Sequence, residues 1–352
     1  MKKLSFLHFM LAILVMASFS MTSCSKEGPA GAAGKDGIDG TDGTDGEDGI
    51  DGVDGSATCI QCHDNSQALE ARVMQWEESF HATGDAFARN TAECATCHTS
   101  QGFRGNLEGT YDWAAEGAMI TNPNPPNCYT CHSIHSTYTT DDWGLTVTGA
   151  IALRNTTETV DFGKGSNCVS CHQGRTVAPW PTVGGADIVV SNTRYGVHHG
   201  PQGNVFSGVG LFVVGNVSNS LHATLVTESC VTCHMASGYG AESGGHTMWM
   251  RNAGGTLNTA GCIECHTDNT ALLAEVTALQ TEVATLLAQL KTKLDASGAT
   301  APGSDNSVAG TYSPLVAGAL LDYKALTEDK SLGVHNPTYV KQLLMNLITA
   351  LP

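Results

Sequence analysis

The spacing of apolar residues predicts a mainly helical chain. Between Ser66 and His81, apolar residues recur every three or four positions, so we expect an amphipathic helix that carries His81 at its end. The residues of this stripe are Leu69, Val73, Trp76 and Phe80. The stripe indicates that one face of this helix is covered by an apolar partner.

A second pattern predicts long helices near the C-terminus. An apolar residue recurs in heptad spacing after residue 268, at Leu272, Val276, Leu279, Val283, Leu286 and Leu290. Asn336 as N-cap and Pro337 at the first helical position then predict a last helix with Val340, Leu343, Leu344, Leu347 and Leu351. Three heptads are marginal alone, so we expect the two helices to pack on each other rather than to form a dimer.

Strands are predicted only in short pieces. The segments 145–153 and 157–162 flank the turn Arg154-Asn155-Thr156 and predict a β hairpin. The segment from Gly208 to Gly215 predicts one further strand. The fold class that follows is mainly α with much irregular structure and small β hairpins.

The N-terminus predicts export. The positive residues Lys2 and Lys3 precede an apolar run from Leu4 to Phe19, and Met21-Thr22-Ser23-Cys24 is similar to a bacterial lipobox. We therefore interpret residues 1–23 as a lipoprotein signal peptide, with a lipid on Cys24 that anchors the chain to the bacterial membrane, in our expectation the outer one. The domain would then be periplasmic or at the cell surface. Secretion with a free Cys24 is the alternative.

Glycine occupies every third position from Gly28 to Gly55. This period is typical of a collagen-like triple helix, because only glycine fits at its axis. Only Pro29 is present there, however, and aspartate fills most later triplets, so a trimeric stalk competes with a flexible acidic spacer. We interpret residues 24–58 as a lipidated tether whose segment from Gly28 to Gly55, if extended, would span on the order of 85 Å.

The charge balance excludes one class of partner. The chain has 17 basic and 34 acidic residues, and removal of Lys2 and Lys3 with the leader leaves 15 against 34, a net charge of −19. Nucleic acid is therefore not an expected partner. A basic protein or a cationic surface fits this charge better, although solubility alone also explains it.

Six copies of Cys-x-x-Cys-His account for twelve of the 13 cysteines. We number them motif 1 to motif 6 along the chain. Their cysteine pairs are Cys59 and Cys62, Cys94 and Cys97, Cys128 and Cys131, Cys168 and Cys171, Cys230 and Cys233, and Cys262 and Cys265. The histidines that follow are His63, His98, His132, His172, His234 and His266. Each motif supplies two thiols for thioether bonds and one imidazole for the iron, so the sequence predicts six covalent haems c.

Zinc sites and thioredoxin-like pairs also use Cys-x-x-Cys. Neither explains a histidine directly after every second cysteine. The cysteine left over is Cys24, which the lipobox explains.

The number of histidines bears on function. Of 14 histidines, His8 lies in the leader and six belong to the motifs. Seven remain for six distal positions: His81, His135, His198, His199, His222, His246 and His335. If each iron binds two imidazoles, one histidine is spare, and we place it within the adjacent pair His198 and His199. Methionine is the other common ligand, but Met235 follows a motif histidine and cannot reach the far face of its own haem.

Four stretches of the chain resemble bacterial multihaem cytochromes c, the assemblage that includes pentahaem nitrite reductases, octahaem hydroxylamine oxidoreductases and tetrahaem electron carriers. They are Asn167 to Arg175 (NCVSCHQGR), Tyr195 to Gln202 (YGVHHGPQ), Gly245-His246-Thr247 and Gly333 to Pro337 (GVHNP). The resemblance covers roughly residues 59–351. The nearly even spacing of the motifs predicts one haem domain, residues 59–268, and the apolar stripes predict a C-terminal extension, 269–352, whose long helices form a hairpin on it. With the resemblance, we expect the haem domain to hold a stack of haems.

The resemblance also implies axial ligands. By it, His81, His222, His246 and His335 are distal ligands, and His198 is favoured over His199. His135, three residues after His132 on one helical face, would point to a neighbouring haem.

These predictions favour an electron carrier over an enzyme. With two histidines on every iron, no site is open, and the chain would pass electrons to redox proteins or an extracellular acceptor in respiration. No motif ends in lysine, as the catalytic motif of the nitrite reductases usually does. The rival is a reductase of a small nitrogen or sulfur oxyanion, with one five-coordinate haem beside Arg175 or Arg194. A scaffold of stacked subunits is a third alternative.

Overall fold

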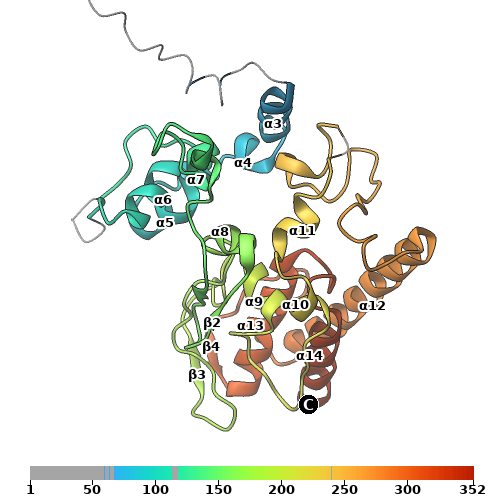
Figure 1. Cartoon of the computed structure of the whole chain (residues 1–352). Helices are drawn as coiled ribbons and strands as arrows, with labels where there is room; N and C mark the ends of the chain where they lie inside the picture. Colours follow the sequence, from blue (N-terminus) through green and yellow to red (C-terminus); the bar gives the residue numbers. More distant parts are fainter. Residues whose placement is uncertain (1–58, 60–62, 64–66, 113–117, 239) are drawn as a thin grey trace, which may run out of the picture. The chain divides into compact units, whose positions relative to one another are not determined.

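A computed structural model describes residues 59, 63, 67–112, 118–238 and 240–352. All of them belong to one compact unit, Asp54–Pro352. The predicted signal peptide, the lipobox and the glycine repeat lie outside the described residues and stay predictions. Most of the described chain is helical or irregular, with a few short strands, as the sequence predicts (Figure 1).

The part of the chain that carries the motifs consists of short elements. Its α-helices are α3 (Gln67–Glu77), α4 (Phe80–Thr83), α5 (Ala92–His98), α6 (Ser100–Leu107), α7 (Cys128–Cys131), α8 (Ser166–Val169), α9 (Gln202–Ser207), α10 (His222–Leu225) and α11 (Cys230–His234). Its 3₁₀ helices are η1 (Ala86–Ala88), η2 (Thr140–Trp143), η3 (Gly163–Gly165) and η4 (Gly245–Thr247).

The predicted helix that leads to His81 is interrupted. Helix α3 ends at Glu77, and Ser79 then caps the short helix α4 by accepting a hydrogen bond from Ala82 N. His81 therefore lies in α4 rather than at the end of α3. The break occurs because the Ser79 side chain satisfies a backbone donor that a continuous helix would pair internally.

The strands form two small antiparallel sheets. Strand β1 (Ile151–Ala152) pairs with β2 (Thr159–Val160), which confirms the predicted hairpin in a shorter form. Strand β3 (Ile188–Val190) pairs with β4 (Gly310–Tyr312). The predicted strand from Gly208 to Gly215 is wrong. That segment has no strand, and φ is positive at Gly208, Gly210 and Gly215, where the chain turns instead.

Three longer helices follow the last motif. They are α12 (Asn269–Ala296), α13 (Pro314–Asp329) and α14 (Pro337–Ala350), and α12 packs on both others. Helix α12 is long and apolar enough to cross a membrane by length and composition. Its buried residues Val283, Leu287, Leu290 and Leu294 belong to the main hydrophobic core, however, so we interpret it as a core helix.

The last helix begins where the sequence predicts. Pro337 is its first residue and Asn336 takes the N-cap position. The Asn336 side chain makes no capping hydrogen bond. Its amide instead donates to the carbonyls of Val205 and Phe206, at 3.2 and 3.0 Å. Asn336 therefore joins α14 to the end of α9.

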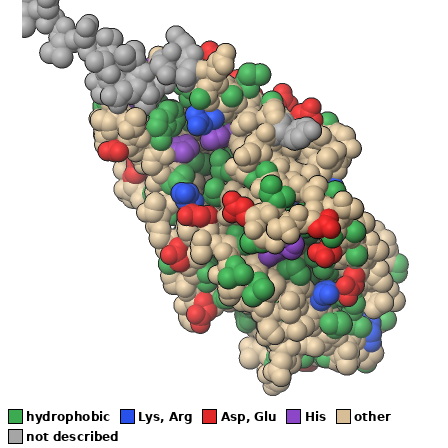
Figure 2. Space-filling view, turned by 45° about the vertical axis from the view of Figure 1, so that its right-hand side comes forward, with side chains coloured by type: hydrophobic (Ala, Val, Ile, Leu, Met, Phe, Trp, Pro, Cys, Tyr) green, Lys and Arg blue, Asp and Glu red, His purple; other side chains and the backbone are tan. Residues whose placement is uncertain are grey.

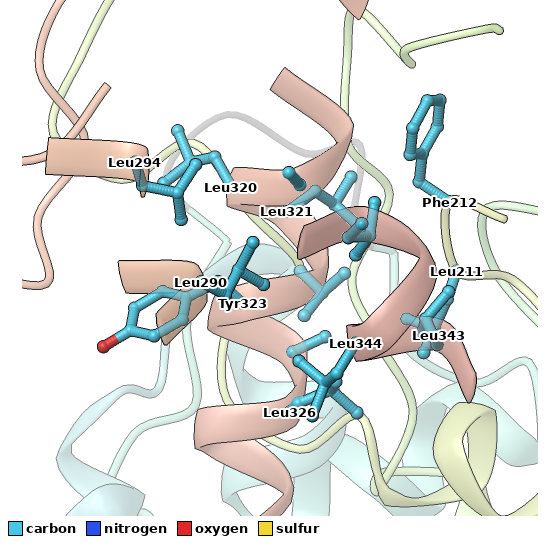
Figure 3. Packing of buried hydrophobic residues seen from close by; sticks show 14 of the residues in the cluster. Leu211, Phe212, Leu290, Leu294, Leu320, Leu321, Tyr323, Leu326, Leu343 and Leu344 are labelled. Carbon is cyan, nitrogen blue, oxygen red and sulfur yellow. The ribbon is translucent and has the colours of Figure 1, made fainter. Parts of the chain in front are cut away.

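The main hydrophobic core lies among these three helices and residues 177–217 (Figure 3). Two leucines from each helix meet there and are fully buried: Leu290 and Leu294 of α12, Leu320 and Leu321 of α13, and Leu343 and Leu344 of α14. Leu211 and Phe212, from the segment predicted as a strand, pack against them. The C-terminal extension thus shares one core with part of the predicted haem domain.

A smaller cluster of Leu153, Phe162 and Val169 lies beside motif 4, but several other helices near the motifs lack a core. Helices α3, α4, α10 and α11 contain no buried residue. Several large apolar side chains there are well exposed, including Phe80 at 68% and Leu221 at 70%. The chain alone does not cover these side chains, so they indicate an apolar partner of another kind.

Candidate haem-binding sites

Motifs 2 to 6 each contain one helical turn. The N–H of the motif histidine bonds to the carbonyl of the first cysteine at His63, His132, His172 and His266, over 2.7 to 2.9 Å. His98 and His234 lie at the ends of α5 and α11. Because one turn holds about 3.6 residues, both cysteines and the histidine lie on neighbouring faces of it. This is the arrangement that attachment to one haem needs.

Five motif histidines face a histidine from elsewhere in the chain. The pairs are His63 with His135, His172 with His81, His132 with His246, His266 with His222, and His234 with His335. Their ring centroids are 6.2, 6.1, 6.3, 6.3 and 6.1 Å apart, in that order. Each pair joins one predicted proximal ligand to one predicted distal ligand.

This spacing fits an iron between the two rings. With a metal–nitrogen bond of about 2 Å on each side, two imidazoles that bind one metal from opposite faces have centroids roughly 6 Å apart. Ordinary aromatic contacts have similar spacings, such as 6.2 Å between Phe162 and Phe206, so the pairing of a motif histidine with another histidine indicates ligation more than the spacing does. All five pairs leave the room that one metal needs.

Motif 2 differs because two histidines lie near His98. Both His198 and His199 contribute to the electrostatic environment of this motif, and their rings are 4.8 Å apart. Nδ1 of His199 lies 2.8 Å from Oε2 of Glu328. His198 has a left-handed backbone, with φ of 64°. The arrangement brings both candidates to motif 2, so the choice between them stays open at this point.

The prediction that His135 shares a helical face with His132 is wrong. Helix α7 ends at Cys131, so His132 and His135 do not share a helical face. His135 instead lies in a turn with φ of 60°. The buried Asp142 holds this turn, because its Oδ1 accepts from Thr137 N at 2.7 Å. The expectation that His135 points to another motif is consistent with its contact with His63.

Hydrogen bonds fix the orientation of several of these rings. Nδ1 of His132, His234 and His222 lies 2.7, 2.9 and 2.9 Å from the carbonyl oxygens of Trp143, Met248 and Val334. Nδ1 of His172 lies 3.2 Å from Oε1 of Gln202, and that of His335 lies 2.6 Å from Oδ1 of Asp329. A ring that donates from Nδ1 presents Nε2 to a metal.

Burial keeps several of the imidazoles neutral. It lowers the pKa of His81 to about 4, with a smaller contribution from the nearby His172 ring. Burial also lowers the pKa of His172, His234 and His246. Neutral imidazole is the form that binds a metal, so these side chains are ready to bind iron at neutral pH.

Five of the motifs open into one continuous cavity of about 3550 Å³. Divided equally among motifs 2 to 6, this volume is about 710 Å³ for each motif. Sites for small molecules have volumes of roughly 300–1,000 Å³. Exposed apolar side chains, among them Val73, Phe80 and Leu221, line it. The predicted stripe of α3 therefore faces this cavity. Figure 2 shows histidine side chains beside hydrophobic and basic ones on one face.

The donor set does not fit the alternatives. Among the described residues, no group of three or more His, Cys, Asp or Glu side chains is placed to hold a metal ion. A structural zinc site needs four such ligands. None of the described cysteines forms a disulfide. Thiol pairs on one turn, opposed imidazoles and an apolar cavity together fit haem c.

The motifs contact one another in a definite order. Cysteine thiols of different motifs lie close enough to shift one another's pKa in three pairs: Cys97 with Cys171, Cys168 with Cys230, and Cys233 with Cys262. Motif 4 therefore contacts motifs 2 and 5, and motif 5 contacts motif 6. Thr146 Oγ1 joins motif 3 to motif 4, because it lies 2.8 Å from both Thr130 O and Asn167 Oδ1. Motif 4 thus has three neighbours.

Motif 1 adjoins motif 3. Tyr129, inside motif 3, places its hydroxyl 3.2 Å from Nδ1 of His135. His135 in turn faces His63 of motif 1. Cys62 lies outside the described residues, so the structure places motif 1 only through Cys59 and His63.

The fold has relatives among solved structures. The outer cell wall cytochrome OcwA superposes with a TM-score of 0.53 at 22% identity, over 80% of this chain and 50% of that one. This chain shares its fold with that structure. An undecaheme cytochrome from the S-layer of Carboxydothermus ferrireducens gives a TM-score of 0.45 at 19% identity, over 84% of this chain and 46% of that one.

The chain spans about half the length of both structures. At these identities the likeness concerns the fold alone. Comparisons of the sequence with protein families and with curated proteins find no match.

Sequence reasoning missed the groups that hold the ligands. Gln202, Met248, Glu328 and Asp329 each contact a ring nitrogen of a histidine predicted to bind iron. Gln202 and Met248 lie within a few residues of predicted ligands, so proximity to them could have suggested a role. Glu328 and Asp329 lie in a helix with an apolar pattern, and no local pattern distinguishes them.

Proposed function

We propose that this chain is a hexahaem c-type cytochrome that transfers electrons between redox partners outside the cytoplasm. The observation that carries the proposal is the set of five histidine pairs with centroids 6.1 to 6.3 Å apart. An iron with two protein ligands has no position for a substrate, so its use is electron transfer. The haems would supply the one-electron chemistry.

The chain itself would fix the order of the haems. The contacts between motifs run from motif 1 through motif 3 to motif 4, and from there to motif 2 or through motif 5 to motif 6. Apolar side chains around the cavity would exclude water and so tune the reduction potentials. An electron could then enter at one motif and leave at another without a mobile carrier.

The expected setting is the cell surface or the periplasm. A lipid on Cys24 would anchor the chain, in our proposal to the outer membrane, and residues 24–58 would give the haem domain reach as a spacer or as a trimeric stalk. The redox partner would be a protein or an extracellular acceptor. The net negative charge favours a partner with a basic docking surface.

A second function is favoured by the surroundings of motif 2. Arg175 and Arg89 lie near His198, and burial followed by Arg175 lowers the pKa of His198 to about 4. One of the two adjacent histidines is not needed for ligation. If neither bound the iron, this site would be open beside two guanidinium groups, which suits reduction of a small nitrogen or sulfur oxyanion.

Optical and low-temperature EPR spectra of the oxidised protein test both functions. Six low-spin irons, unchanged by cyanide or nitrite, are expected for the carrier. A high-spin signal from about one iron in six, shifted by added cyanide, would favour the reductase. The mass of the mature protein separately checks the six haems.

A further inference from the structure

Two adjacent carboxylates at the end of α13 hold two different predicted axial ligands. Oε2 of Glu328 lies 2.8 Å from Nδ1 of His199, beside motif 2. Oδ1 of Asp329 lies 2.6 Å from Nδ1 of His335, which faces motif 5. The Asp329 side chain is 1% exposed and that of Glu328 is 31% exposed. Ser331 donates a further hydrogen bond to Asp329.

The same two residues also contact Gln202, whose side chain lies beside the histidine of motif 4. The side-chain amide of Gln202 donates to the carbonyl of Glu328 at 3.1 Å and to that of Asp329 at 3.5 Å. Oε1 of Gln202 lies 3.2 Å from Nδ1 of His172. Ligands that serve motifs 2, 4 and 5 are therefore held at one helix end, and motif 4 lies next to both motif 2 and motif 5.

The charge of the hydrogen-bond partner differs among these motifs. His172 contacts the neutral amide of Gln202, and His81, on the other side of motif 4, contacts the neutral sulfur of Met248 at 3.0 Å. His199 and His335 contact carboxylates. A carboxylate that accepts from Nδ1–H makes the imidazole more basic, which stabilises ferric iron and lowers the reduction potential.

We propose that Glu328 and Asp329 are positioning residues that keep the haems of motifs 2 and 5 at lower potential than the haem of motif 4, with His199 as the distal ligand of motif 2. This inference rests on the proposed function. Its consequence is that motif 4, which contacts three other motifs, is reduced before the neighbouring motifs 2 and 5. His198 is then the spare histidine, whereas the motif resemblance favours it as the ligand.

Charge-neutral substitutions test the proposal. Glu328→Gln and Asp329→Asn keep an oxygen that can accept from Nδ1 but remove the negative charge. In a spectropotentiometric titration of the haem-loaded protein, each variant is expected to move one of the six one-electron steps to higher potential, and the double variant two. The shift is expected to be larger for Asp329→Asn, because its side chain is better shielded from water.

Glu282→Gln is the matched control. Glu282 forms an exposed ion pair with Lys341 at 3.3 Å and does not line the cavity, so the substitution removes the same charge away from the ligands. If Asp329→Asn fails to fold, Glu328→Gln still tests the effect at a more exposed position. EPR spectra show whether the irons stay low-spin in each variant.

The outcomes separate this inference from the proposed function. Low-spin irons whose potentials move in the double variant no more than in Glu282→Gln would overturn the inference and leave the carrier function intact. A high-spin iron in the unaltered protein would instead count against the carrier function before any variant is made. Low-spin irons with two raised steps would support both.

Discussion

The imidazole rings of His81 and His172 lie 6.1 Å apart at 71° to each other, although 91 positions separate them in the sequence. His81 comes from a one-turn helix before motif 2, and His172 belongs to motif 4. Five of the six motif histidines face a histidine from another segment in this way. Coordination of iron by such pairs would tie separate segments together, as a disulfide does in other small-core proteins.

Removal of His81 is expected to open one iron. In His81→Ala the iron of motif 4 would lose its distal ligand, because His81 is the histidine that faces His172. About one sixth of the haem should then become high-spin and should bind cyanide. EPR and optical spectra with and without cyanide measure this change. Six low-spin irons in the variant would show that His81 is not a ligand.

The adjacent pair beside motif 2 gives a matched comparison. His199→Ala is expected to produce one high-spin iron, because the ring held by Glu328 at 2.8 Å would be lost. His198→Ala is expected to leave all six irons low-spin. The opposite result would assign the ligand to His198, as the motif resemblance implies, and unchanged spectra in both variants would mean that each histidine can replace the other.

Local patterns predicted local structure well. The stripe of α12, the Asn336-Pro337 start of α14 and the hairpin of β1 and β2 are all present. Each depends on backbone geometry and on contacts within a short segment. The heptad stripe proved to serve two partners, since Leu272 and Val276 line the cavity while Val283 and Leu290 lie in the core.

The pairing of histidines could be predicted only in part. Counting ligands gives seven candidates for six positions, but nothing in the spacing shows that His246 faces His132 rather than the nearer motif 6. Such pairs are fixed by tertiary packing around a cofactor that leaves no periodic trace. The carboxylate of Asp329 was missed for the same reason, because its partner His335 lies in the loop beyond α13.

Without haem, the two parts of the domain should differ in stability. Helices α12, α13 and α14 share a buried core, whereas α3, α4, α10 and α11 have no buried residue. In protein made without haem attachment, amide hydrogen exchange is expected to be slow in the three C-terminal helices and fast in α3, α4, α10 and α11. Equal protection of both parts would show that the motif region folds without its cofactor.

Asp322 should make stability fall as the pH rises. Its carboxyl is fully buried, which raises its pKa well above the usual range even though Phe212 N–H donates to it at 2.9 Å. The folded state therefore retains a proton that the unfolded chain loses near pH 3.9, and stability decreases above that pH. The free energy of unfolding should fall by about 1.4 kcal/mol for each pH unit between the unfolded and the folded pKa. In Asp322→Asn this dependence on pH should be absent.

Urea unfolding at several pH values between 4 and 8 measures the effect. Asp295→Asn is the control of opposite sign, because hydrogen bonds from Lys291 and Thr300 lower the pKa of Asp295. Asp295 stabilises the fold above the unfolded pKa and ceases to do so only as the pH falls through its lowered folded pKa, below the measured range. Its variant should therefore lose stability about equally from pH 4 to 8. A parallel pH profile for Asp322→Asn and the unaltered protein would contradict the prediction.

Asn336 joins two predicted distal ligands through its buried side chain. Its Oδ1 accepts from Ser220 N at 2.8 Å, two residues before His222, and Asn336 directly follows His335. Val334 O lies 2.9 Å from Nδ1 of His222. Asn336→Ala would leave buried backbone groups unpaired, at a cost of about 3 kcal/mol, and is expected to loosen the ligands that face motifs 5 and 6.

Asn346→Ala separates stability from ligation. Asn346 bridges α14 to the carbonyls of Val214 and Asn216 at 2.8 and 3.0 Å, but it adjoins no predicted ligand. The substitution Asn346→Ala should lower the free energy of unfolding by only about 1 kcal/mol and should not change the haem spectra. Asn336→Ala should lower the urea midpoint further and should add a fraction of high-spin iron. If both variants change stability but neither changes the spectra, Asn336 supports the helix alone and the two ligands are fixed by other contacts.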